Sequence, residues 1–84
     1  MTEKEIGKVF LYFSKMGVAA IKLTGNLSIG EKIHIKGHTT DFEQQVDSMQ
    51  IDNKPIKEAK PGDDIGIKVP DKVRPNDTVF LIED

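Results

Sequence analysis

The sequence predicts an all-β fold, a small closed barrel of six antiparallel strands. Two short segments, residues 32–36 and 65–69, alternate strictly between apolar and polar side chains, and each follows a glycine turn at Gly30 or Gly62. Four further strand-like segments fill the rest of the chain, and none of them reads convincingly as a helix. Closing the sheet into a barrel would remove the exposed strand edges that so short a chain cannot cover.

The first two strands are predicted as a hairpin. Residues 6–13 are rich in β-branched and aromatic side chains, and they end at the turn Ser14-Lys15-Met16-Gly17. Residues 18–23 form the returning strand, which closes at Thr24-Gly25-Asn26. The third strand covers residues 32–36, with its isoleucines on one face and its charged residues on the other.

Residues 42–51 allow two interpretations. Phe42 and Val46 share one strand parity, whereas Met49 and Ile51 share the other. A helix would also place Phe42, Val46 and Met49 on one side. We favour a strand with a bulge near Asp47-Ser48, because a bulge changes which residues face inward.

The remaining strands cover residues 65–69 and 77–82, separated by a connection between Pro70 and Pro75. The inward parity of the six strands predicts a core made of these residues: Val9, Leu11, Phe13, Ala19, Ile21, Leu23, Ile33, Ile35, Phe42, Val46, Met49, Ile65, Ile67, Val69, Val79 and Leu81.

Length and composition predict a single domain over residues 1–84. The 84 residues include 37% hydrophobic and 31% charged side chains, which is typical of a globular protein. No apolar run is long enough to span a bilayer, and the first residues lack the features of a secretion signal. We therefore expect a cytoplasmic protein without membrane contact. The absence of cysteine excludes disulfides and thiolate metal sites.

Catalytic and metal-binding constellations are weak in this sequence. His34 and His38 are four residues apart, but a glycine turn separates them and no third ligand is near in sequence. Asp63 and Asp64 are adjacent, so on a strand they would point to opposite faces, and Asp63 is better explained as a turn residue. The sequence thus predicts no enzyme activity, no cofactor and no metal site.

One surface combines aromatic and basic side chains. If Val9 points inward on its strand, then Lys8, Phe10 and Tyr12 point outward. Lysines and a histidine on the next two strands would complete this face, which comprises Lys8, Phe10, Tyr12, Lys22, Lys32, His34 and Lys36. Lysines can neutralise phosphates while rings stack on bases, so the face suits RNA. A protein contact explains it equally well, as does a plain solvated surface. The net charge of −2 gives RNA binding no general support.

Several motifs resemble the second, β-barrel domain of translational GTPases such as elongation factor Tu. The matching elements are Leu27-Ser28-Ile29-Gly30-Glu31-Lys32-Ile33 and the later turn Pro61-Gly62-Asp63, within a resemblance that covers residues 6–82. It implies a Greek-key-type barrel of the translation-protein domain two kind. The GTPases also need a glycine-rich phosphate loop, which this chain lacks. The resemblance therefore implies a barrel without GTPase activity.

A second resemblance is to the C-terminal barrel of collagenase-like peptidases. The segment from Phe42 to Met49, followed by Lys54-Pro55-Ile56, carries this likeness. The catalytic domain of that family is absent from the sequence. Both resemblances imply the same fold and a non-catalytic binding module.

Two functions follow as hypotheses. The first is a module that acts in translation or RNA metabolism through contact with RNA or a ribosomal particle. The alternative is an accessory subunit that docks onto a separately encoded enzyme, its partner being a protein chain. The sequence leaves the oligomeric state open.

Overall fold

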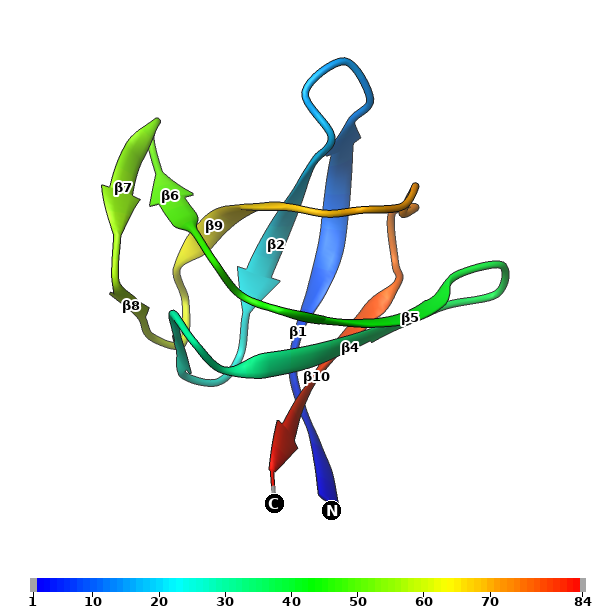
Figure 1. Ribbon diagram of the computed structural model, residues 1–84, viewed down its shortest axis with the longest axis horizontal. Coiled ribbons are helices and arrows are strands. Elements are labelled where there is room, and N and C mark those ends of the chain that lie inside the picture. Colours follow the sequence, from blue (N-terminus) through cyan, green and yellow to red (C-terminus); the bar gives the residue numbers. More distant parts are fainter. Residues whose placement is uncertain (1, 84) are drawn as a thin grey trace.

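Ten β-strands make up the computed structural model, which describes residues 2–83 (Figure 1). They are β1 (Thr2–Phe13), β2 (Val18–Leu23), β3 (Leu27–Ser28), β4 (Lys32–Lys36), β5 (Asp41–Gln45), β6 (Met49–Ile51), β7 (Lys54–Ile56), β8 (Glu58–Ala59), β9 (Asp64–Lys68) and β10 (Thr78–Glu83). The predicted all-β class is confirmed. Within residues 2–83 there is also no helix with the length and apolarity that crossing a membrane would require.

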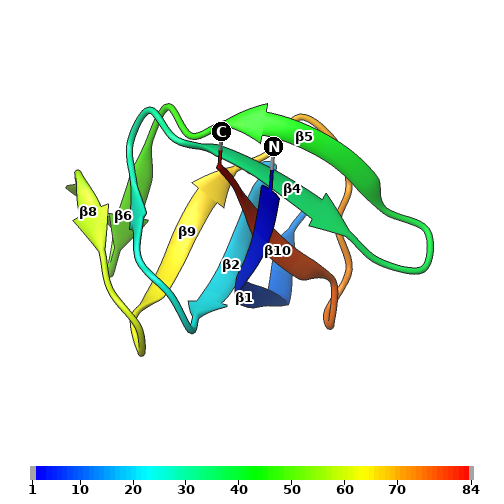
Figure 2. The ribbon, with the colours of Figure 1, turned by 90° about the horizontal axis from the view of Figure 1, so that it is seen from below.

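Eight of these strands form one antiparallel sheet in the order β5-β4-β10-β1-β2-β9-β6-β7, and β3 pairs with β8 separately. The long strand β1 lies at the centre of the sheet. Its first part pairs with β10, and its second part pairs with β2. Figure 2 shows β1 beside β10 and the sheet curling from β4 and β5 round to β9. Because β1 joins the two halves, surfaces at its two ends lie on different parts of the sheet.

The sheet is not closed into a barrel, so the prediction of a closed six-stranded barrel is wrong in closure and in strand number. The edge strands are β5 and β7, and no pairing joins them within residues 2–83. Beyond β5, the backbone of Val46 continues the pairing with the chain before β4. Its backbone N–H donates to the carbonyl of Glu31, and its carbonyl accepts from the N–H of Gly30. These bonds tie the chain to a turn, and no strand completes the circle.

Residues 42–51 are extended, and the helical interpretation is wrong for them. The extended segment is interrupted at residues 46–48, beside the predicted bulge at Asp47-Ser48. Before the interruption β5 pairs with β4, and after it β6 pairs with β7 and β9. The interruption therefore carries the chain from one half of the sheet to the other.

The core agrees largely with the predicted parity. Most of the predicted residues are buried, and Phe42 packs against them while partly exposed. Buried residues that the sequence did not indicate are Ile6, Ala20, Leu27, Ala59 and Val73. Leu27 and Ala59 belong to the small β3–β8 pair, which covers one side of the core.

Two irregularities in β1 overturn part of the core prediction. The register shifts between Glu5 and Gly7 against β10, and between Val9 and Leu11 against β2. At the second shift Val9 pairs with Ile21 and Leu11 with Ala20, so Phe10 is an extra residue, as in a β-bulge. The bulge reverses the alternation beyond it. Leu11 and Phe13, expected in the core, are 47% and 42% exposed, and Tyr12 packs against the core instead.

Candidate functional site

The predicted basic and aromatic surface is only partly assembled. The four lysines of the set and Phe10 are exposed, and His34 is half-buried on the same outer face. Tyr12 is the exception, because the bulge at Phe10 turns it toward the core. The prediction that Tyr12 points outward is therefore wrong, and the aromatic part of the set is reduced to Phe10.

Strand register places three of the lysines in one row across the sheet. Lys36 is opposite Thr78, Thr78 is opposite Lys8, and Lys8 is opposite Lys22. Asp41 stands beside Lys36 at one end of the row, and Asp64 stands beside Lys22 at the other. The Lys22 Nζ lies 3.6 Å from Asp64 Oδ1. The row of lysines thus ends in a carboxylate on each side.

The neighbouring rows of the same face add further acids. Register places Glu43, His34, Phe80 and Glu5 in the next row, and Glu3 opposite Ile82 beyond it. Together these rows contain four lysines (Lys8, Lys22, Lys32, Lys36) and five carboxylates (Glu3, Glu5, Asp41, Glu43, Asp64). The face is therefore mixed in charge, and it lacks the positive potential that phosphate binding requires.

His34 makes two side-chain hydrogen bonds on this face. Its Nδ1 lies 2.9 Å from Glu3 Oε1, and its Nε2 lies 2.5 Å from Asp41 Oδ1. The hydrogen bond to Asp41, followed by the one to Glu3, raises the pKa of His34 above its usual value. The same bond from His34 lowers the pKa of Asp41. His38, the other histidine considered, is exposed in the turn after β4 and belongs to no such cluster.

A groove of about 420 Å³ lies between the β1–β2 hairpin and the β6–β7 hairpin, away from His34. Its lining includes Phe10, Phe13 and Met16 from the β1–β2 hairpin and Gln50, Asp52 and Asn53 from the β6–β7 hairpin. Ala20 and Gly66, which are cross-strand partners, also line it. Because both are small, the sheet surface between the two hairpins is low there. A side chain added at Gly66 would come within 3.3 Å of Gln50 and Val18.

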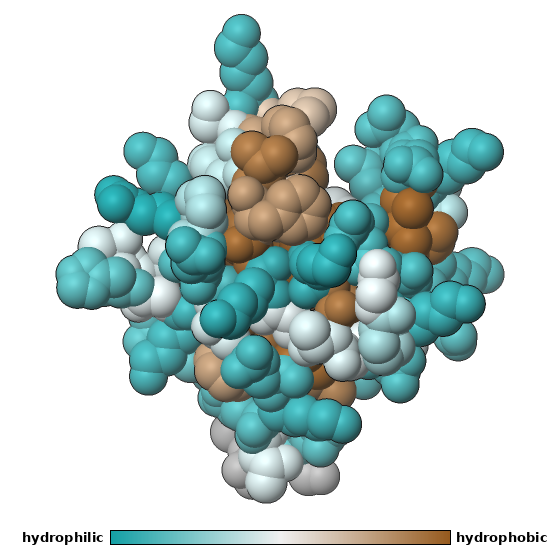
Figure 3. Space-filling model, turned by 180° about the vertical axis from the view of Figure 1, so that it is seen from behind, coloured by the Kyte–Doolittle hydropathy of each residue, from teal (hydrophilic) through white to brown (hydrophobic). Residues whose placement is uncertain are grey.

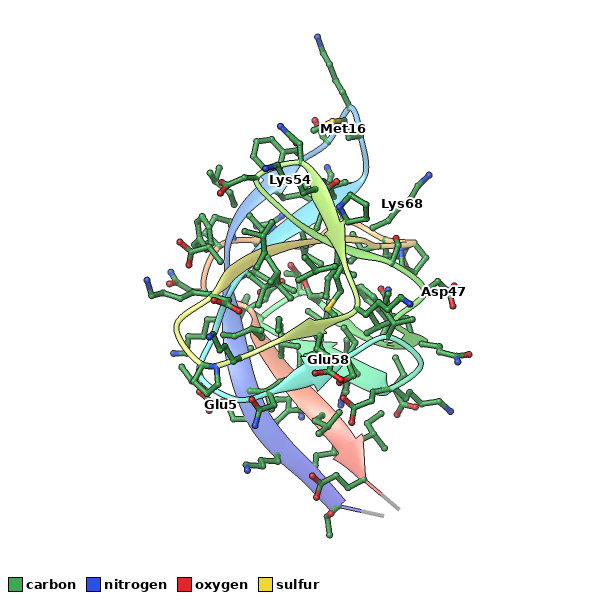
Figure 4. The ribbon with its side chains drawn as sticks, turned by 90° about the vertical axis from the view of Figure 1, so that its left-hand side faces the viewer. Glu5, Met16, Asp47, Lys54, Glu58 and Lys68 are labelled. Atoms are coloured by element: carbon green, nitrogen blue, oxygen red, sulfur yellow. The ribbon has the colours of Figure 1, made fainter. Side chains whose placement is uncertain are left out.

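The hairpin side of this groove is unusually apolar for an exposed surface. Of its lining residues, Phe10 is 44%, Phe13 42% and Met16 58% exposed. Leu11 of the same hairpin does not line the groove but is 47% exposed, and these are four of the five large hydrophobic residues that are exposed among residues 2–83. Figure 3 shows apolar side chains gathered over the end of the molecule where the β1–β2 hairpin lies. In Figure 4, Met16 and Lys54 of β7 both lie at this end, whereas Glu5 lies toward the other.

Sequence reasoning missed this groove because the bulge at Phe10 cannot be seen in the alternation alone. Regular alternation predicts Leu11 and Phe13 in the core, and the turn composition predicts Met16 only as a turn residue. One signal was available: residues 10–13 are four consecutive apolar or aromatic side chains, and a regular strand exposes alternate members of such a run.

Comparisons with known proteins relate the chain to proteases. It is 42% identical over 81 residues to an uncharacterized protease of Methanocaldococcus jannaschii, covering 95% of this chain and 20% of that protein. It is 38% identical over 80 residues to a collagenase of Porphyromonas gingivalis, covering 93% of this chain and 22% of that protein. The chain thus spans about a fifth of the length of these curated relatives. No family model matches it.

A solved structure has the same fold. It is the C-terminal domain of a candidate U32 peptidase from Geobacillus thermoleovorans, with a TM-score of 0.89, 17% identity, and coverage of 95% of this chain and 93% of that one. The selenomethionine variant of the same domain gives a TM-score of 0.86 at 18% identity, covering 90% of this chain and 96% of that one. At such identities the likeness shows the fold alone.

These findings correct the interpretation that the chain is related to translation factors. The relatives are proteases and collagenases, and their similarity extends over nearly the whole of this chain. The expectation of a translation or RNA-metabolism module acting through RNA or the ribosome is therefore wrong, whereas the resemblance to collagenase-like peptidases is confirmed. The chain is similar in sequence to a segment of protease-like proteins, and it has the fold of a U32 peptidase C-terminal domain.

Proposed function

We propose that this chain is a non-catalytic accessory domain that docks onto the catalytic domain of a protease-like protein, through the groove between the β1–β2 and β6–β7 hairpins. The observation that carries the proposal is the exposed apolar side of that groove. The comparisons support it, because the proteins similar to this chain are named as proteases or collagenases and are about five times as long.

The groove has the features of a protein contact. Exposed apolar patches on small domains mark interaction sites, and aromatic side chains supply much of the binding energy in protein interfaces. Pairing of β1 with β2 holds the backbone on either side of Phe10 and at Phe13, so docking would cost this backbone little conformational entropy. The opposite wall carries Asp52 and Asn53, which provide a polar rim.

A non-catalytic role agrees with the arrangement of the carboxylates that the sequence singled out. Asp63 Oδ2 accepts a hydrogen bond of 3.0 Å from the backbone N–H of Lys60, as the turn interpretation predicted. Asp64 is paired with Lys22 on the outer face. The two carboxylates therefore serve separate local contacts and do not converge on a common substrate position.

A binding experiment tests the proposal. The chain is titrated with a purified protease-like catalytic domain from the organism that encodes this chain. That domain is identified by its similarity to the four-fifths of the curated relatives that this chain does not cover. We expect a 1:1 complex. The double variant Phe10→Ser, Phe13→Ser should weaken it by at least about tenfold, because both rings are lost from the interface.

Ile29→Ser is the matched control for this experiment. Ile29 is also a large exposed hydrophobic residue, at 41% exposure, but it does not line the groove. Its replacement should leave the affinity unchanged, and circular dichroism should show all variants folded. Absence of any complex would overturn the accessory role. Equal affinities of the Phe10, Phe13 variant and the parent chain would overturn the groove as the contact.

A further inference from the structure

A second cluster of functional side chains lies away from the groove, around His34. Three strands supply it: Glu3 comes from β1, and His34, Asp41 and Glu43 come from the consecutive strands β4 and β5, which are distant from β1 in sequence. One ligand atom from each of Glu3, His34 and Glu43 lies within 4.8 Å of the other two. An imidazole nitrogen and carboxylate oxygens are donors that divalent transition metals such as Zn²⁺ accept.

Asp41 prepares the imidazole of His34 to act as a ligand. The Nε2–H of His34 donates to Asp41 Oδ1, so this nitrogen is committed to a carboxylate. The other nitrogen, Nδ1, then faces Glu3 Oε1 at 2.9 Å. Metal-bound histidines commonly donate their second ring N–H to a carboxylate, which fixes the tautomer and the ring orientation. Asp41 has this position before any metal is bound.

Strand pairing and packing hold the cluster in place. His34 is the cross-strand partner of Glu43 on one side and of Phe80 on the other. The imidazole and the Phe80 ring are 6.2 Å apart between centroids, and the His34 side chain is only 13% exposed. Glu3 and Glu43 are more exposed and have long side chains. They can therefore close from 4.8 Å to the roughly 3.5 Å between donors that bonds of about 2.1 Å to Zn²⁺ require.

The local charge favours a divalent cation. Three carboxylates surround one imidazole, and the carboxylate of Glu43 makes no hydrogen bond or ion pair within residues 2–83. Lys32 and Lys36 flank His34 on the same strand face, and Glu5 stands opposite Phe80. The proton that makes the imidazole cationic compensates only part of this negative charge. Zn²⁺ in place of the Nδ1 proton adds a further unit of positive charge.

We propose that Nδ1 of His34 and the carboxylates of Glu3 and Glu43 form a binding site for a divalent transition-metal ion, oriented by Asp41 from outside the coordination shell. Water completes the coordination. Binding releases the proton that Nδ1 shares with Glu3 in the metal-free protein. The site lies across the β1, β10, β4 and β5 part of the sheet, so it is separate from the groove and independent of the proposed docking.

Titration with ZnCl₂ at pH 7.5 in a buffer without chelators tests the site, followed by calorimetry and by NMR of the histidine ring nitrogens. We expect one equivalent of Zn²⁺ to bind with a dissociation constant below about 100 µM and to shift the His34 ring signals. Asp41→Asn should weaken binding by about 10- to 100-fold, as the loss of outer-shell partners does elsewhere.

Two substitutions separate this site from unspecific binding. Glu43→Gln removes a ligand while leaving the bonds of His34 to Glu3 and Asp41, so the variant should fold normally and bind at least about tenfold more weakly. His38→Gln removes the other histidine, which is exposed and outside the cluster, and should bind as the parent chain does. No binding below about 1 mM, or equal losses in the Glu43→Gln and His38→Gln variants, would overturn the proposal.

Discussion

The two ends of β1 present opposite kinds of surface. Near its start, Glu3 hydrogen-bonds His34, which also bonds Asp41, within a cluster of charged groups. Near its end, Phe10 and Phe13 are exposed and have no apolar cover on their outer side. The first surface is charged and favours contact with water, whereas the second would lose unfavourable contact with water if a partner covered it. This difference is the basis for the docking proposed at the groove.

The bulge at Phe10 creates this difference, because it turns Tyr12 inward and Phe13 outward. The stabilities of Tyr12 and Phe13 variants give the largest expected effect with which to test the bulge. Tyr12→Ala should lower the free energy of unfolding by about 2–3 kcal/mol, because the ring packs against the core. Phe13→Ala should lower it by less than about 1 kcal/mol, because the ring is exposed. Urea unfolding followed by circular dichroism measures both. The reverse order would mean that β1 alternates regularly and that the groove does not exist.

The charged end of β1 should respond to pH, with a smaller effect. The pKa of His34 is raised in the folded chain by Asp41 and Glu3, so its contribution to stability is fully present below about pH 6.5 and is lost as pH rises through the raised value. The pKa of Asp41 is lowered, so its contribution is present above about pH 3.9 and is lost as pH falls through the lowered value.

Comparison with His34→Gln isolates that contribution in buffer containing a chelator. The melting temperature of the parent chain should exceed that of the variant by a few degrees at most between about pH 4 and 6.5, since exposed ion pairs contribute little. The difference should shrink above that range. A difference that grows toward pH 9 would contradict the protonated, doubly bonded His34. Phe13→Ser is a suitable reference, because its melting temperature should show no such dependence relative to the parent.

The lysine row should have the smallest effect on partner binding. Lys8→Ser should change the affinity for the catalytic domain by less than about twofold, because the carboxylates of the same face balance the lysines. Raising the salt concentration from about 50 to 500 mM should weaken the complex by less than about tenfold, since an apolar contact is not strongly screened. A steep loss in either titration would move the docking surface from the groove to the lysine row.

The alternating segments explain how much of the fold could be predicted. Ile33 with Ile35, and Ile65 with Ile67, are buried as their parity required, because a strand period of two is a local property. The predicted turn role of Asp63 is local in the same sense. Closure of the sheet is not local. It depends on which strands pair at the edges of the sheet, and even the backbone partners of Val46 lie about fifteen residues away in the turn before β4.

The candidate sites show the same limit more sharply. His34 and Lys36 were correctly placed on one outer face, but their acidic neighbours Glu3 and Asp41 come from other strands. Register between strands decides which charges meet, and register is set by bulges and turns across the whole sheet. The sequence suggests only the pair His34 and His38 as a metal candidate, whereas the cluster in the structure combines His34 with carboxylates from β1 and β5, which are distant from each other in the chain.

The sequence alone therefore determined the longer strands, most of their inward faces and most of the core, because these follow from the period of the chain itself. Only the tertiary structure decided that the sheet stays open, that Tyr12 turns inward while Leu11 and Phe13 turn outward, and that carboxylates surround His34. One extra residue in β1, at Phe10, reverses the faces of all that follows it in the strand. Such a bulge is fixed by pairing with β2, and pairing is a property of the folded molecule.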